Sequence, residues 1–451
     1  LIMGVAYDQS DILKRMGSVD SDIRFIAIND FITMLEPSEF KIDSSRESEF
    51  VVHILRLLHD KNKGVQNHAL KCLGLLCNKI TIEQLKVIFS QLKSTMVDVD
   101  KLRDVELRGI HTIGLKTITN ALSASDSSVS QLVIKEVVPT LIQTMGSGTN
   151  SDAIMEAYDL LLDMNNSYSL SALLIPYHSD IVDYILRDIE STHGLMRKGT
   201  CNLLSSLAWY ISSAELNIVF GYILNRMLVN VNDSCDAVAT FAAEQRTSIS
   251  KQRPRLGMQL EQASTTGSTC AVASALNAAA CNLNRAPSFI EPVLQLLLWV
   301  LQKQNRAGEV NSDDLMELLL QTLNTLLFYY PNFPRHWILK VAAQLYESLQ
   351  YGASYDIDTR DVESMSVDEA PGNEVDQTDD EDEDLDCFSD DDGDSSWKVR
   401  RAAVQALEML IQRYPDMIPD CSLKLPGLLN MCFKEPVDTV RQSCFSCVSM
   451  M

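Results

Sequence analysis

Residues 60–74 read DKNKGVQNHALKCLG. A polar, acidic turn leads to an apolar residue, Val65, which is followed by an amide, Gln66, and by a small residue, Ala69, three positions further on. The acidic and polar residues favour the N-terminus of a helix through capping and the helix dipole. The small residue allows close approach of a neighbouring helix. The stretch therefore predicts a helix that starts after the turn and packs tightly on another.

The same pattern recurs along the chain, and we call its leading apolar position the repeat mark. Successive marks are separated by 42, 42, 46, 43, 119, 84 and 41 residues. Five of these gaps match the HEAT-repeat period of roughly 40–47 residues. We interpret the gap of 84 as two periods, and the gap of 119 as two periods plus an insertion of about 35 residues. The marks are Ile23, Val65, Leu107, Ala153, Met196, Leu315, Val399 and Val440.

Helical periodicity also marks the segments between these positions. EFVVHILRLLHD at 49–60 and PRHWILKVAAQLYESL at 334–349 have apolar residues at i, i+3, i+4 and i+7. Alternating β-branched runs with Asn-Gly turns do not occur. One antiparallel helix pair cannot bury its apolar face alone, so neighbouring pairs are expected to stack into a continuous core. The sequence predicts an all-α fold, an α-solenoid of HEAT repeats, rather than a generic helix bundle.

Two segments interrupt the pattern. Residues 232–266 are rich in Ser, Thr and Gln and include SKQRPR, so we expect a polar, flexible insertion of doubtful helical character. Between Asp356 and Asp394 lie 19 acidic residues and one arginine, which carry −18 of the net charge of −23 and leave −5 for the rest. Such a like-charge run does not fold alone. It follows a first helix and precedes a second, so we expect a disordered acidic loop inside one repeat.

The expected organisation follows from these assignments. It places HEAT repeats at 5–230, the polar insertion at 232–266, HEAT repeats at 267–351, the acidic loop at 352–396 and HEAT repeats at 397–451. The chain opens at Leu1 rather than Met, and we expect the series of repeats to be cut short at its C-terminal end.

Composition excludes several classes of protein. A net charge of −23 and a pI near 4.7 argue against a general nucleic-acid binder and against docking on anionic membranes. Eleven scattered cysteines indicate free thiols in a reducing compartment. The longest apolar stretches are too short or too interrupted to span a bilayer. We expect a soluble protein of the cytoplasm and nucleus.

Motifs that carry chemistry are absent from the sequence. GxxxxGK[ST], GxSxG, HExxH and paired CxxC motifs do not occur, so we predict no enzyme, cofactor or metal site. Cys444 and Cys447 lie at helical spacing, where a buried apolar pair is favoured over a metal or redox site. Thr378 and Ser389 precede acidic residues, as acidophilic kinases prefer, and are predicted phosphorylation sites.

Four segments carry a family resemblance. They are SDIRFIAIND at 21–30, LLHDKNKGVQNHALKCLG at 57–74, LRDVELRGIHTIGLKTI at 102–118 and SSWKVRRAAVQALEML at 395–410. They resemble the N-terminal part of the cullin-associated, neddylation-dissociated proteins, the Cand family, also described as TBP-interacting proteins. The resemblance covers most of 5–120 and 335–451, is weaker across 121–230 and departs most at 232–266.

The resemblance implies a non-enzymatic scaffold. Family members are HEAT solenoids that wrap around cullins lacking the ubiquitin-like modifier, block neddylation and compete with substrate-receptor modules, so that receptors exchange. The family's N-terminal part embraces the cullin C-terminal region and its RING subunit. The implied partners are therefore a cullin and its RING subunit, held by a monomeric solenoid within a hetero-complex. If this N-terminal third is the whole protein, cullin binding is expected without adaptor eviction.

Basic residues at or just after the marks have two interpretations. They contact acidic partner surfaces from a long surface made of second helices, or they pair with acidic side chains of adjacent repeats. The candidates for partner binding are Arg24, Arg108, Arg197, Lys198, Arg400, Arg401 and Arg441.

Two other scaffolds remain as alternatives. A karyopherin-like nuclear transport receptor is also an acidic HEAT solenoid, sometimes with an acidic loop within a repeat. A phosphatase-scaffold-like protein has more regular repeats and lacks acidic insertions.

Overall fold

The computed structural model describes residues 8–97, 104–122, 127–147, 150–168, 175–231, 236–262, 268–307, 313–330, 333–352, 395–417 and 433–449. Throughout these ranges the regular elements are α-helices and short 3-10 helices, with no strand. The predicted all-α fold is confirmed, and the chain is an α-solenoid of HEAT repeats. None of the helices in these ranges is both long and apolar enough to cross a membrane.

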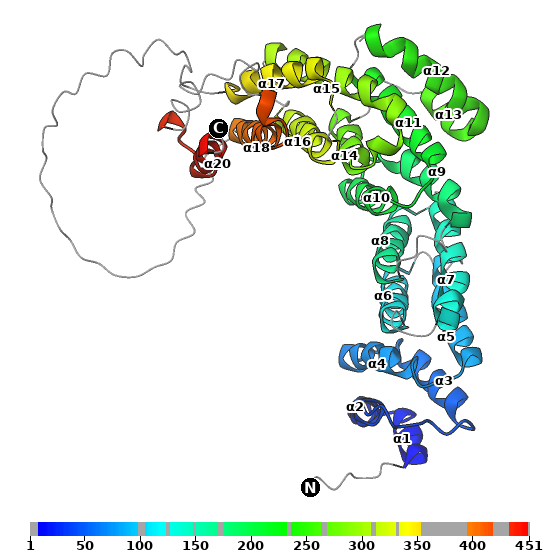
Figure 1. Cartoon of the computed structure of the whole chain (residues 1–451). Coiled ribbons are helices and arrows are strands. Elements are labelled where there is room, and N and C mark those ends of the chain that lie inside the picture. The colour runs from blue at the N-terminus through cyan, green and yellow to red at the C-terminus, as the bar shows by residue number, and fades with distance from the viewer. Residues whose placement is uncertain are drawn as a thin grey trace, which may run out of the picture. The chain divides into compact units, whose positions relative to one another are not determined.

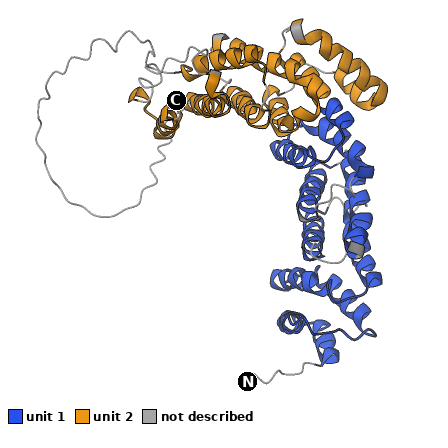
Figure 2. Cartoon of the chain, in the orientation of Figure 1, with its two compact units in different colours: residues 1–219 blue, residues 220–451 orange. Residues whose placement is uncertain are grey.

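Two compact units divide the chain, residues 1–219 and residues 220–451 (Figure 2). In the first unit each helix pair packs on the next, so first helices form one layer and second helices another (Figure 1). The first helices are α1 (Gln9–Met16), α3 (Glu47–Leu57), α5 (Ile82–Val97), α7 (Ser127–Ser147) and α9 (His178–Asp188). The second helices are α2 (Ser21–Leu35), α4 (Lys63–Leu76), α6 (Val105–Leu122), α8 (Ser151–Tyr168) and α10 (Gly194–Leu207).

The second unit repeats this arrangement. Its second helices pack in chain order, and α15 and α17 form the layer of first helices. The second helices are α14 (Thr269–Ala280), α16 (Asp313–Tyr329), α18 (Ser396–Arg413) and α20 (Asp438–Ser449). The remaining helices are α12 (Asp236–Gln252), α13 (Pro254–Glu261), α15 (Ile290–Ala307) and α17 (Arg335–Leu349), while α11 (Ser213–Val231) contains the boundary between the units. Short 3-10 helices are η3 (Ile175–Tyr177), η4 (Leu283–Arg285), η5 (Pro287–Phe289) and η7 (Pro415–Met417).

Each repeat mark lies in the first turn of a second helix, as its third or fourth residue. Local capping explains why these helices start there. The Asp20 carboxylate accepts a hydrogen bond from the Asp22 N–H, and Asn62 Oδ1 accepts one from the Gly64 N–H. These bonds satisfy donors that the first helical turn leaves unpaired.

The small residues four positions after the marks lie where two helices meet. Ala27, Ala69, Ala157 and Ala403 are completely buried. A larger side chain at these positions would push neighbouring helices apart, because interiors pack at crystal-like density. The sequence pattern thus reports the closest contact between repeats.

Residues 236–252 and 254–261 form helices, so the expected flexible insertion is wrong there. Helix α12 packs against α13 and α15, and the Phe241 and Phe289 rings lie 5.1 Å apart between centroids. The buried side chains of the pair are few and are separated by polar residues, which hid the helical period. They are Val238, Ala242, Ile249, Leu256 and Leu260.

The gap of 84 residues between marks is one repeat, not two, because α18 packs directly on both α16 and α17. Residues 353–394, with most of the predicted acidic loop, lie outside the described residues. The described chain on either side of them meets closely. Gly352 has φ +60°, and a Cβ placed on it would lie 2.5 Å from Ser396 Cβ, so only glycine fits. Arg400 Nη1 donates to the Tyr351 carbonyl at 3.1 Å and holds the junction.

The buried alanine of α4 gives a direct test of the stacking. We expect Ala69→Leu to lower the free energy of unfolding by about 1–3 kcal/mol, because the added carbons must displace a neighbouring helix. Chemical denaturation of the full chain measures this loss. Ala214→Leu, at an exposed position in α11, adds the same carbons and should leave stability nearly unchanged. Equal losses in the two variants would contradict the assigned packing.

Candidate protein-binding surface

The arginine that follows a repeat mark forms the same ion pair in both units. Arg24 Nε lies 2.6 Å from Asp60 Oδ2, and Nη2 lies 2.8 Å from Oδ1. Arg400 Nε lies 2.9 Å from Glu435 Oε2, and Nη2 lies 3.0 Å from Oε1. Asp60 and Glu435 both lie five residues before the next mark. Each two-point pair therefore joins one second helix to the turn that precedes the next.

Arg108 makes the related contact between α6 and α8. Its side chain is 1% exposed, and its Nε lies 3.0 Å from Glu156 Oε1. The second oxygen of Glu156 accepts a hydrogen bond from Thr112 Oγ1 at 2.8 Å. Arg108 is thus enclosed and neutralised within the chain.

Two further arginines fasten the turn before their own helix. Arg197 Nη1 donates to the carbonyls of Ser191 and Thr192, at 2.7 and 3.1 Å. Arg441 Nη1 donates to the Glu435 carbonyl at 3.1 Å. These guanidinium groups satisfy carbonyls in the turns between first and second helices.

The structure therefore favours the pairing interpretation for most of the candidate arginines. Arg108 and Arg400 are buried against carboxylates, so the expectation that they face a partner is corrected. Arg24, although half-buried, spends both nitrogens of its fork on Asp60. A partner would have to break these bonds and leave a carboxylate unpaired at considerable cost.

Lys198 and Arg401 are placed differently. Lys198 is exposed on α10 and forms no ion pair with another described residue. Arg401 is 34% exposed, lies 4.9 Å from the centre of the Trp397 ring and 3.5 Å from Glu317 Oε1. Both cations remain predicted partner contacts. Thr378 and Ser389 lie outside the described residues.

The thiols of the described helices are structural. Cys444 and Cys447 are each 1% exposed, as expected for a buried pair. Burial raises the pKa of Cys77 to about 12 and that of Cys201 to about 11, so these thiols stay protonated near neutral pH. Across the described ranges, no three His, Cys, Asp or Glu side chains are grouped so that they could hold a metal ion.

Second helices also expose large apolar side chains. Trp209 and Tyr210 follow α10 and are 49% and 46% exposed. They lie 13 and 14 residues after Met196, and Phe328 and Tyr329 lie at the same distances after Leu315. Exposed apolar groups of this size mark protein-binding surfaces. Further examples on second helices are Ile26, Ile113, Leu195 and Phe445.

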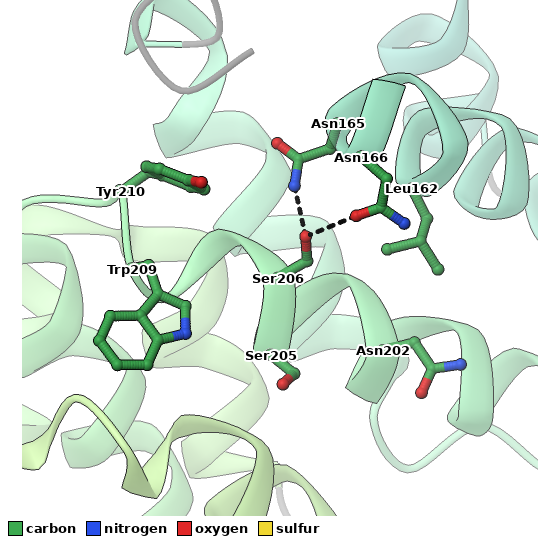
Figure 3. A pocket seen from close by; sticks show the side chains of 8 residues that line it. All are labelled: Leu162, Asn165, Asn166, Asn202, Ser205, Ser206, Trp209 and Tyr210. Atoms are coloured by element: carbon green, nitrogen blue, oxygen red, sulfur yellow. Dashed lines mark hydrogen bonds between the residues drawn. The ribbon is translucent and has the colours of Figure 1, made fainter. Parts of the chain in front are cut away.

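A hollow of about 590 Å³ adjoins Trp209 and Tyr210, between the C-terminal halves of α8 and α10 (Figure 3). The remaining lining residues are Leu162, Asn165, Asn166, Asn202, Ser205 and Ser206. Sequence reasoning missed this site. The one available signal was the aromatic pair at a position where the repeats of α4, α6 and α8 have Asn78, Asn120 and Asn166.

Curated relatives confirm the family resemblance. The chain is 29% identical over 97% of its length to cullin-associated NEDD8-dissociated protein 1 of Drosophila melanogaster, covering 31% of that protein. It is 27% identical over 99% of its length to cullin-associated NEDD8-dissociated protein 2 of Mus musculus, covering 32% of it. The chain thus spans about a third of the length of these relatives. No family model matches the chain.

Solved structures share the helical architecture. A structure of the karyopherin Kap121p covers 98% of this chain and 44% of its own, with 12% identity and a TM-score of 0.46. The Kap95:Nup1 complex contains a chain with 12% identity and a TM-score of 0.43, matched over 97% of this chain and 50% of its own. Such distant similarity does not bear on what the chain binds.

The Arg24–Asp60 pair should make stability depend on pH. The Arg24 guanidinium, hydrogen-bonded to Asp60, holds the pKa of that carboxyl below its usual 3.8. The unfolded state therefore binds the proton first as pH falls, so the stabilisation is present above about pH 4 and is lost below it. We expect Asp60→Asn to be less stable than the unmodified chain at pH 7, with a difference that narrows towards pH 2.5 in denaturation experiments. The exposed control Glu36→Gln should show no such narrowing.

The two adjacent arginines of α18 should differ strongly. Arg400→Ala leaves the Glu435 carboxylate buried without its partner, so we expect a loss of about 3–5 kcal/mol in the free energy of unfolding. Arg401→Ala removes a partly exposed pair and a ring contact, with an expected loss of about 1 kcal/mol or less. Calorimetry of both variants makes the comparison. A larger loss for Arg401→Ala would contradict the assigned contacts.

Proposed function

We propose that the chain is a non-enzymatic scaffold that binds cullin-RING ubiquitin ligase cores lacking the ubiquitin-like modifier. The observation that carries this proposal is the similarity, over 97% of the chain, to a protein named for its association with cullins. The fold suits the role, since a solenoid presents a continuous surface to an elongated partner. Exposed aromatic and aliphatic side chains on the second helices supply contact area of the kind that dominates protein interfaces.

The proposal includes two finer activities, exchange of substrate receptors and a block of cullin neddylation. Both would arise from occupancy, because a helical stack that covers the modification site or overlaps a receptor excludes the competing protein. The chain corresponds to a third of its relatives' length, so receptor exchange is proposed for the whole protein. The block of neddylation is the activity to examine first in this chain.

Electrostatics would guide the encounter with a partner. Most of the negative charge of the sequence lies between Asp356 and Asp394, and the remaining residues carry only −5. The repeats are thus nearly neutral, and exposed cations such as Lys198 can meet acidic groups of a cullin or RING subunit. The proposed sites of action are the cytoplasm and the nucleus, without nucleic acid or membrane.

Binding of the full chain to purified proteins tests the proposal. We expect capture of an unmodified cullin-RING core and little capture of the same core carrying the ubiquitin-like modifier. A GTP-loaded GTPase of the Ran type serves as the ligand of the alternative, a karyopherin-like receptor. Equal capture of both cullin forms, or capture of the GTPase alone, would overturn the proposal.

A charge reversal tests the predicted contact at Lys198. We expect Lys198→Glu to weaken cullin binding by about two- to tenfold, the range for exposed ion pairs. Lys71→Glu reverses an exposed lysine on α4 and is the matched control. Equal affinities of the two variants in titration calorimetry would remove Lys198 from the interface.

A further inference from the structure

The hollow between α8 and α10 has an unusual lining for a helical scaffold. Amides and hydroxyls dominate it, contributed by three asparagines and two serines, and no charged side chain lines it. The Trp209 and Tyr210 rings flank it on the turn after α10 (Figure 3). Its volume of about 590 Å³ falls within the range of established binding sites.

Asn165 shows that this lining is not saturated by its own hydrogen bonds. The residue is 5% exposed, and its Nδ2 donates to Ser206 Oγ, which in turn donates to Asn166 Oδ1 at 3.5 Å. Its Oδ1 points away from Ser206 and has no partner among the described residues (Figure 3). A buried acceptor without a donor costs about 1–3 kcal/mol. An incoming N–H group would recover that energy.

The chemistry of the lining selects a class of ligand. A side-chain amide offers one acceptor and one donor side by side, which matches the N–H and C=O of a peptide main chain. Asn202 and Ser205 are exposed along α10 and add to this set. The absence of cations from the lining disfavours phosphate and carboxylate ligands. A neutral main chain in extended form fits best.

Charge next to the hollow selects the side chain that accompanies this main chain. Asp159 and Asp163 lie one and two turns before Asn166 on the same face of α8. They share a single cation, Lys116, whose Nζ lies 3.2 Å and 2.5 Å from their oxygens. One negative charge is left over, and the half-exposed indole of Trp209 can bind a cationic side chain along its stem.

A second hollow, of about 450 Å³ at the turns before α4 and α6, lacks these properties. Its lining includes Asp60, which is bound to Arg24, and the mutually paired Lys63 and Glu106. The charges of that hollow are already satisfied within the chain.

We propose that the hollow between α8 and α10 binds an extended segment of a partner protein through its main-chain amides, with a lysine or arginine of that segment on Trp209. The acidic stretch of this chain between Asp356 and Asp394 is a poor occupant, because its carboxylates would face Asp159 and Asp163 without a free cation. The assignment goes beyond cullin binding, since any partner with an accessible extended segment of this kind could use it.

Peptide binding to the full chain tests the proposal. The probe is a blocked, fluorescently labelled peptide of serines with one central lysine, followed by anisotropy. Its comparators are the same peptide with N-methylated backbone amides and a peptide with glutamate in place of lysine. We expect the first peptide to bind, and each comparator to bind about tenfold more weakly or worse, since one lost hydrogen bond to a charged or buried group costs about 1.5 kcal/mol.

Two variants place the peptide in the hollow. Asn202→Ala and Trp209→Ala change exposed side chains and should weaken binding of the lysine peptide by about five- to tenfold. Asn29→Ala removes an exposed asparagine from the second helix α2 and should have no effect. Unchanged binding in both hollow variants, or equal binding of the N-methylated peptide, would overturn the proposal. No cullin is present in these titrations, so their result is independent of the cullin capture.

Discussion

Every helix pair in this protein has an apolar face that only the next pair can cover. The completely buried alanines at the starts of α2, α4, α8 and α18 mark where that coverage is closest. Ion pairs such as Arg24–Asp60 and Arg400–Glu435 cross the same boundaries and fix how one repeat sits on the next. Stability is therefore a sum of contacts between neighbours, and the exposed surface of the second helices is a by-product of that stacking.

The regular part of the fold was predictable because one structural event leaves one sequence trace. A polar cap, an apolar mark such as Val65 and a small residue such as Ala69 all report the start of a second helix. Spacing alone was less reliable. It could not separate two repeats from one repeat with a long insertion, which is why the gap before Val399 was misjudged. Polar composition at 236–261 likewise concealed helices, since burying few side chains is enough when a neighbouring helix supplies the rest of the core.

Binding residues were harder to predict than helices. Position after the mark selected Arg24, Arg108 and Arg400, but an arginine that faces a partner and one that faces the next repeat occupy the same position in the sequence. Only the placement of Asp60, Glu156 and Glu435 decides between them. The hollow was invisible for another reason. Asn165 and Ser206 lie 41 residues apart on helices whose contact defines the site, and nothing periodic links them.

The junction of Gly352 with Ser396 has a consequence for engineering and for evolution. The chain departs and returns at nearly the same point, held there by Arg400. The entropy of closing a loop rises only slowly with its length, so the excursion can grow or shrink by many residues at little cost to the helices. Any protein module with neighbouring termini could be spliced in at this point, which makes the junction a natural place to attach a reporter domain.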